Sequence, residues 1–217
     1  IVTYGGVLTD RSSVADTANA LEGEGYRVVA GINGDFYNVS TGLPIGLVIT
    51  DGVLRSSDAG YYAIGFRADG TAVLGKPGVK VSVDLGYAVD DGSGSPVELI
   101  RPVIAVNKAR TNSGVFLYTY DFNAKHTTGT TEAGVNVVCT VEQGQLAIGS
   151  TVTARVERVE ETTVTSIQPD QIVLSANANA DAYYTNALRN MSAGSEVTLT
   201  VSANAGWDDV EYAVGAL

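Results

Sequence analysis

Cysteine, histidine, methionine and tryptophan are nearly missing from this 217-residue sequence, which has one of each. The single cysteine, Cys139, cannot form a disulfide within the chain, and its apolar surroundings, VNVVCTVE, favour a buried side chain. The single histidine, His126, lies in a polar segment and has no second histidine or cysteine to complete a zinc site. A zinc enzyme and a cysteine-dependent mechanism are therefore not expected.

Basic residues are also scarce, with 13 Lys and Arg against 24 Asp and Glu and a formal net charge of −11. Proteins that bind nucleic acid need an excess of cations to neutralise phosphates, so we expect no nucleic-acid partner. No apolar run approaches the roughly 18 residues of a membrane helix, so we expect no membrane-spanning segment. The hydrophobic content of 45% is typical of a globular protein.

Short β-prone runs rich in Val, Ile, Thr and Tyr are abundant, and Gly, Asp, Asn and Ser separate them. Asp-Gly pairs at 51–52 and 69–70 mark two hairpins, and helices are expected at 12–22 and about 180–191. The sequence thus predicts an α+β fold dominated by mixed or antiparallel sheets. Strands are expected at 26–32, 46–50, 53–56, 61–67, 71–75, 79–85, 97–106, 114–120, 134–142, 151–159, 162–167, 171–175 and 195–202.

Residues 135–202 differ from the rest, because they are rich in Thr and Val and poor in aromatics. Their segment TVTARVERVEETTVTSI alternates apolar and charged residues, as half-exposed antiparallel strands do. We therefore divide the chain into a first part at 1–134, a β-rich subdomain or insertion at 135–202, and a return to the first part at 203–217.

The most informative stretch is 31–57, GINGDFYNVSTGLPIGLVITDGVLRSS. A strand candidate there runs into Asn33-Gly34-Asp35 and then into Phe36 and Tyr37. Asn-Gly is a strong hairpin signal, and Asp35 is then an ordinary turn residue. The following residues do not alternate as a returning strand should. A polar rim beside two aromatic rings suits a sugar instead.

The segment GINGDFYNVSTGLPIGLVITDG resembles the signature of the phosphodiester glycosidase family, which includes the lysosomal uncovering enzyme of mannose 6-phosphate tagging. A second similarity is the pair Asn107 and Arg110, which precedes an apolar strand ending in Tyr118 and Thr119. The resemblance implies hydrolysis of a sugar-1-phosphodiester, in a cell-envelope or exopolysaccharide context, by a secreted or cell-surface protein.

Family members usually continue past the position of 213–215 into a Gly-rich strand, an Arg-Thr-Ala segment and an Asp-Gly-Gly motif. None of these is present in this sequence. The resemblance therefore implies a partial family domain, truncated within 203–217, whose remaining C-terminal segment would be a partner in completing the active site.

For the phosphate, the resemblance implies a cation, and Arg110 is the best candidate because its planar guanidinium can hold two phosphate oxygens. Asn107 would be a neutral donor nearby. Arg55 and Arg101 are the next candidates. The alternative for Arg110 is a surface ion pair, which is the more common role of an arginine.

For the sugar, cleavage at an anomeric carbon usually involves two carboxylates, and Asp35 and Glu132 are the candidates. Asn33 would bind a sugar hydroxyl or orient the attacking water, and Phe36 or Tyr37 would cover the ring. The alternatives are a turn role for Asp35, a solvated Glu132, and a core position for Phe36.

Several carboxylate and amide oxygens could bind a divalent cation such as calcium as a cofactor, although no spacing of these residues matches an EF-hand loop. These oxygens belong to Asp35, Asn38, Asp51 and Asp58. A rival to the enzyme is a non-catalytic carbohydrate-binding or cell-surface module with the same fold. If the protein is an enzyme, we expect one cleft to bring together Asn33, Asp35, Asn107, Arg110 and Glu132.

Overall fold

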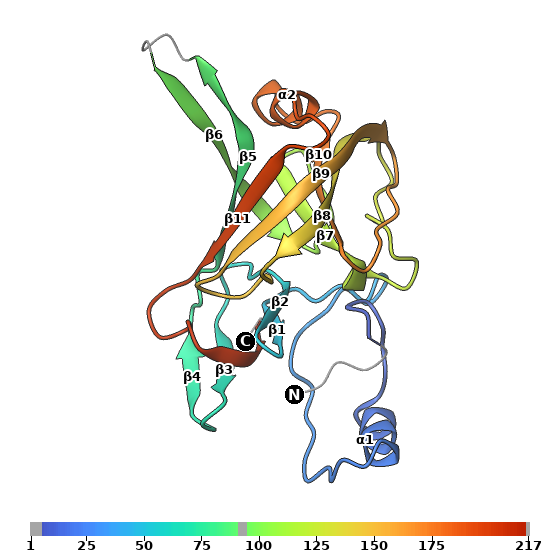
Figure 1. Ribbon diagram of the computed structural model, residues 1–217. Coiled ribbons are helices and arrows are strands. Elements are labelled where there is room, and N and C mark those ends of the chain that lie inside the picture. Colours follow the sequence, from blue (N-terminus) through green and yellow to red (C-terminus); the bar gives the residue numbers. More distant parts are fainter. Residues whose placement is uncertain (1–5, 91–94, 216–217) are drawn as a thin grey trace.

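The strands of the protein form two connected sheets in a computed structural model that describes residues 6–90 and 95–215. One sheet has five strands in the order β2-β1-β12-β3-β4, and the other closes into a barrel in the order β10-β7-β6-β5-β11-β9-β8. Figure 1 shows the barrel above the smaller sheet, with α2 near the far end of the barrel. The predicted sheet-dominated α+β fold is confirmed.

The smaller sheet is antiparallel throughout its described pairs. Its hairpins turn at the two predicted Asp-Gly pairs, where Asp51, Gly52 and Gly70 have φ values of 52°, 73° and 83°. Such left-handed conformations match the twist of the flanking strands. The last strand of the chain enters between β1 and β3. The strands are β1 (Val48–Thr50), β2 (Val53–Ser56), β3 (Ala63–Arg67), β4 (Ala72–Gly75) and β12 (Val210–Val214).

The barrel is antiparallel except for the pair β6 and β7, which run parallel. Buried residues of its strands and of the smaller sheet belong to one hydrophobic cluster, so the two sheets share a core. The barrel strands are β5 (Lys80–Asp90), β6 (Pro96–Val106), β7 (Val115–Thr119), β8 (Gly134–Gln143), β9 (Thr151–Thr162), β10 (Gln171–Asn177) and β11 (Glu196–Ser202).

The barrel strands thus run from Lys80 to Ser202 and lie on both sides of the division expected at 134/135. The Thr- and Val-rich composition distinguishes only the later barrel strands from the rest of the chain. The closed barrel also contains β5, β6 and β7, which lie before residue 135. After the barrel, β12 pairs with β1 and β3 in the smaller sheet.

Both helices lie where they were expected. Helix α1 (Val14–Gly23) begins after Ser13, whose hydroxyl accepts a hydrogen bond from the Asp16 amide. Helix α2 (Ala182–Arg189) begins after Asp181, whose carboxylate accepts from the Tyr183 amide. These short polar side chains satisfy amides that the first helical turn leaves free. A single 3-10 turn, η1 (Tyr120–Phe122), follows β7.

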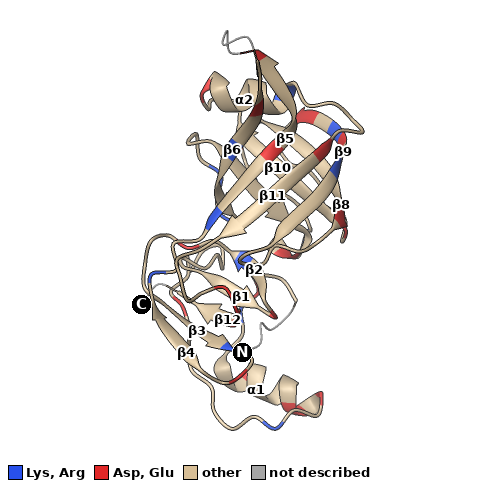
Figure 2. Ribbon diagram, turned by 60° about the vertical axis from the view of Figure 1, so that its left-hand side comes forward, with Lys and Arg blue, Asp and Glu red and all other residues tan. Residues whose placement is uncertain are grey.

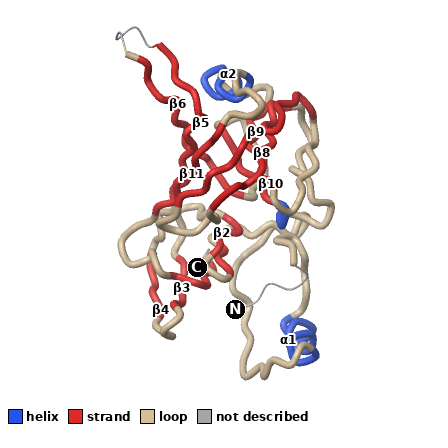
Figure 3. Tube along the Cα trace, in the orientation of Figure 1, coloured by secondary structure: helices blue, strands red, loops and turns tan. Residues whose placement is uncertain are grey.

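Two strand predictions are wrong. Residues 26–32 belong to the long loop that follows α1 (Figure 3), and Val29 and Ile32 are 85% and 89% exposed. The other, 162–167, lies past the end of β9 and forms a single bridge from Ser166 to Thr127. High β propensity alone does not make a strand, because 26–32 pairs with none of the described strands, although β2 and β4 leave edges of the smaller sheet open.

The alternating charges predicted on 151–167 lie on the outside of β9, where basic and acidic groups are neighbours (Figure 2). Arg155 lies 2.6 Å from Glu142, and Arg158 lies 2.9 Å from Glu160. Exposed ion pairs of this kind contribute little to stability, so this strand face serves mainly as a solvated surface.

A close approach in the barrel predicts a stability effect at Gly86. This residue has φ +71° in an irregular part of β5, and an added Cβ would overlap the Glu196 carbonyl oxygen. We expect Gly86→Ala to lower the unfolding free energy by about 3 kcal/mol, from backbone strain and overlap together. Gly194→Ala, at φ +88° in open space, should cost only about 1 kcal/mol. Equal losses in urea unfolding would contradict the close approach.

Candidate functional site

The connection between β6 and β7 brings several polar residues to the junction of barrel and sheet. The parallel pairing sets Val103 beside Val115 and Val106 beside Leu117, so the chain must turn back within residues 107–114. The turn starts at Asn107, whose φ is 52°, a conformation that asparagine tolerates.

Asn107 is 1% exposed, and its side chain is fully used inside the fold. Its amide nitrogen donates to the Arg55 carbonyl at 2.9 Å and to the Thr119 hydroxyl at 2.8 Å. Its amide oxygen accepts from the Thr119 main-chain nitrogen at 3.0 Å. Asn107 therefore holds the connection to β2 and β7 and has a structural role here.

The guanidinium of Arg110 is half-buried and contacts barrel residues, unlike the surface ion pair considered as its alternative. Nη1 donates to the Ser175 hydroxyl at 2.8 Å and lies 3.4 Å from Asn136 Oδ1, and Nη2 donates to the Glu132 carbonyl. Nε is buried and has no hydrogen-bond partner among the described residues. Burial lowers the pKa of Arg110, although arginine stays charged at neutral pH.

Gly134, the first residue of β8, makes room for that guanidinium. A Cβ at this position would clash with Arg110 Nη1 and with the Ala176 carbonyl oxygen. Glycine is therefore the residue that lets Arg110 lie against the end of the barrel.

Arg110 and Glu132 line one cavity of about 420 Å³. Its size lies within the usual range for small-molecule sites. The Glu132 carboxylate accepts a hydrogen bond from Asn177, so the cavity combines a cation, an anion and an amide. The cavity is also lined by Thr41, Leu43, Ala109, Thr111, Asn112, Tyr118, Phe122, Thr128, Gly129, Thr130, Thr131 and Asn177.

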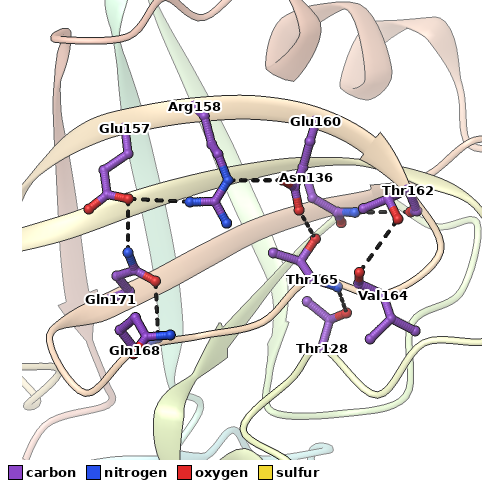
Figure 4. A network of polar contacts seen from close by, with 10 residues as sticks. All are labelled: Thr128, Asn136, Glu157, Arg158, Glu160, Thr162, Val164, Thr165, Gln168 and Gln171. Carbon is purple, nitrogen blue, oxygen red and sulfur yellow. Dashed lines mark hydrogen bonds and ion pairs between the residues drawn. The ribbon is translucent and has the colours of Figure 1, made fainter.

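Thr128, Thr130 and Thr131 form the threonine wall of this cavity. A network of hydrogen bonds holds Thr128 in place (Figure 4). The Thr165 amide donates to the Thr128 hydroxyl at 3.1 Å, and the Thr165 hydroxyl donates to Glu160 at 2.6 Å. The Asn136 amide donates to a main-chain carbonyl at the end of β9, while its oxygen lies near Arg110. The guanidinium and the threonine wall are thus anchored to the same end of β9, which favours a preformed site.

Asp35 does not line this cavity. Its Oδ2 accepts from the Gly46 amide at 2.9 Å, and its Oδ1 is buried without a partner in the described part of the chain. Burial raises the pKa of Asp35, against the lowering effects of the Gly46 hydrogen bond and of nearby Lys108. A desolvated carboxyl with a raised pKa is a candidate proton donor.

The other predicted sugar-binding residues are exposed. Phe36 and Tyr37 are 70% and 47% exposed, so their rings are not core residues. Asn33 lies instead at a separate cavity of about 680 Å³ between α1 and residues 26–34. Of the five residues expected in one cleft, Arg110 and Glu132 share the cavity of about 420 Å³, and the other three do not line it.

The two alternative cations have structural partners. Arg55 forms an ion pair with Asp121, and the Arg101 guanidinium lies 3.6 Å from the centroid of the Tyr183 ring. The positive charges of Arg55 and Arg101 are therefore engaged by groups of the fold itself.

The four residues considered for calcium make separate local contacts. Asp51 accepts from the Tyr212 hydroxyl, Asp58 from the Gly78 amide, and Asn38 from the Ser40 amide. Within residues 6–90 and 95–215, no group of three or more His, Cys, Asp or Glu side chains could hold a metal ion.

The single cysteine and the single histidine both pack against other residues of the fold. Cys139 is fully buried, as predicted, and burial raises the pKa of its thiol to about 12, which makes it a poor nucleophile. His126 stacks on Tyr120, with ring centroids 3.7 Å apart. In the described part of the chain, no helix has the length and apolar character needed to cross a membrane.

Sequence reasoning missed Lys108, Gly134 and the threonines of the cavity wall. Lys108 stands between the two residues of the Asn107 and Arg110 motif, and only its position in that motif could have drawn attention to it. Gly134 follows the Thr-rich segment that ends at Glu132, but a steric requirement for glycine is invisible without coordinates.

Similar folds occur in solved structures. No protein-family profile and no curated protein matches the sequence. A hypothetical protein from Synechocystis has a TM-score of 0.68 and 15% identity over 99% of this chain and 35% of its own. A Burkholderia pseudomallei protein described as "Putative exported protein" has a TM-score of 0.61 and 14% identity over 97% of this chain and 44% of its own. At such identities the likeness shows the fold alone, and the chain spans less than half of either protein.

The contacts of Asn107 predict a loss of stability on substitution. In Asn107→Leu, the Arg55 carbonyl and the Thr119 amide would lose buried partners, so we expect the unfolding free energy to fall by about 3 kcal/mol. Urea unfolding measures this, with the exposed Asn190→Leu as control. An unchanged urea midpoint together with weaker ligand binding would instead make Asn107 a ligand-binding residue.

Proposed function

We propose that the protein hydrolyses a sugar-1-phosphodiester and that the Arg110 cavity holds its sugar-phosphate part. The main support is that Arg110 and Glu132, from distant parts of the sequence, line one cavity of about 420 Å³ with hydroxyl and amide groups around them. The resemblance of residues 31–52 to the phosphodiester glycosidase signature supplies the reaction. The substrate belongs to a cell-envelope or exopolysaccharide context.

The cavity has suitable chemistry for such a ligand. The Arg110 guanidinium would attract the phosphate, because a charge-assisted hydrogen bond is stronger in a half-buried site. Asn112 and Thr131 line the cavity with exposed side chains, which would meet sugar hydroxyls. Glu132 is the carboxylate inside the cavity, and it would stabilise positive charge that develops on the sugar ring.

Asp35 does not line the cavity, so it would pass a proton to the leaving phosphate through a water between them. Its raised pKa keeps the carboxyl protonated to a higher pH than an exposed aspartate. Since phosphate is a better leaving group than a sugar alkoxide, modest proton donation suffices.

A non-catalytic carbohydrate-binding or surface module is the second candidate. The observation that favours it is the distribution of the predicted residues, because Asn33, Asp35 and Asn107 do not line the Arg110 cavity. In that case the Arg110 cavity would bind a carbohydrate without cleaving it.

We further propose that the protein is secreted or held at the cell surface. The support is the cell-envelope context implied by the family resemblance, together with a structural neighbour described as "Putative exported protein". Fractionation of the source cells with an antibody to the chain would test this.

Binding and turnover of the methyl phosphodiester of glucose 1-phosphate test the function. Arg110→Gln removes the charge, so we expect its affinity, measured by calorimetry, to fall at least tenfold, equivalent to about 1.4 kcal/mol. Arg189→Gln is the matched control, because Arg189 pairs with Glu161 on the exposed side of α2.

Each outcome separates the candidates. Binding with release of glucose supports the hydrolase, and binding without release favours the carbohydrate-binding module. Equal affinities of Arg110→Gln and the unmodified protein would refute the role of Arg110.

A further inference from the structure

Lys108 holds a segment of three residues through its ammonium group. Nζ donates to the carbonyl oxygens of Pro44, Ile45 and Gly46 at 2.6, 2.9 and 3.0 Å. An ammonium has three N–H donors, so these bonds use its full capacity. A lysine in a loop usually extends into solvent, whereas this one is committed to main-chain carbonyls.

The same segment is held by Asp35. Its carboxylate accepts from the Gly46 amide at 2.9 Å, while Lys108 donates to the Gly46 carbonyl. The two side chains of opposite charge thus fix both polar groups of one residue. The charged groups that act on Lys108 are Asp35 and Asp58.

The segment 44–46, which Lys108 and Asp35 clamp, is connected to the Arg110 cavity in two ways. The loop that precedes it contributes Thr41 and Leu43 to the cavity lining. The Lys108 carbonyl accepts a hydrogen bond at 3.0 Å from the hydroxyl of Tyr118, which also lines the cavity. Lys108 itself lies two residues before Arg110.

We propose that Lys108 is a positioning residue, which fixes segment 44–46 against the β6–β7 connection and thereby sets both the Asp35 carboxyl and the shape of the Arg110 cavity. Its effect on ligand affinity rests on the proposed function, but its effect on the segment does not. Lys108 acts through other groups and needs no contact with the ligand.

The clamp depends on pH. Burial lowers the pKa of Lys108 to about 8, and Asp35 and Asp58 oppose this shift. A neutral amine has two N–H donors, so one of the three carbonyls loses its partner above that pH. Because the folded pKa lies below the unfolded one, the unfolded state binds more protons above pH 8. Overall stability therefore rises with pH there while the clamp loosens.

Amide NMR tests the clamp without a ligand. We expect the Gly46 amide resonance to shift with a midpoint near pH 8 in the unmodified protein and in Lys125→Met, whose lysine is exposed. The transition should vanish in Lys108→Met, which keeps the length of the side chain but not its charge. It should also vanish in Lys108→Arg, which stays charged. If Lys108→Met does not fold, Lys108→Arg decides the test.

A Gly46 resonance at the same position in Lys108→Met as in the unmodified protein, or the same transition in Lys108→Arg, would overturn the proposal. The second arm measures affinity for the methyl phosphodiester of glucose 1-phosphate, whose single charge is constant, at pH 7 and pH 9. We expect at least a threefold loss at pH 9 in the unmodified protein and none in Lys108→Arg. Without binding at either pH, the proposed function fails and the Gly46 transition alone decides the clamp. A Gly46 transition with equal affinities refutes the coupling to the cavity.

Discussion

The parallel pairing of β6 with β7 is the constraint on which the rest of the structure depends. It closes the barrel, and it forces the chain to turn back within residues 107–114 instead of using a tight hairpin. That turn needs anchors, which Asn107 supplies through its contacts with Arg55 and Thr119. It also carries Arg110 to the end of the barrel, where Gly134 leaves space for the guanidinium.

Local signals made much of the fold predictable. Asp-Gly pairs predict both hairpins of the smaller sheet, and a serine cap predicts the start of α1, because these features depend on neighbours in sequence. The expected strand at 26–32 is absent although β2 and β4 leave sheet edges open, because β propensity does not determine which segments pair. The extent of the barrel was hidden for a similar reason, since closure depends on pairings between distant strands.

The site could be predicted only in part. Residue type and the family resemblance predict Arg110 and Glu132 as site residues, and the two share a cavity. Nothing in the sequence distinguishes a buried, fully bonded asparagine such as Asn107 from one that faces a ligand. Lys108 was overlooked because lysine is usually exposed, although here its ammonium binds three carbonyls and joins the Asp35 segment to the Arg110 connection.

The central claim is that a sugar phosphate binds in the cavity beside Arg110. The most direct measurement is an NMR titration with the methyl phosphodiester of glucose 1-phosphate that follows the Arg110 Nε–H signal together with the main-chain amides. We predict saturable shifts at Arg110, Thr128 and Thr130, on the lining of one cavity. Shifts confined to α1 and Asn33, at the separate cavity, or no change at Arg110, would contradict it.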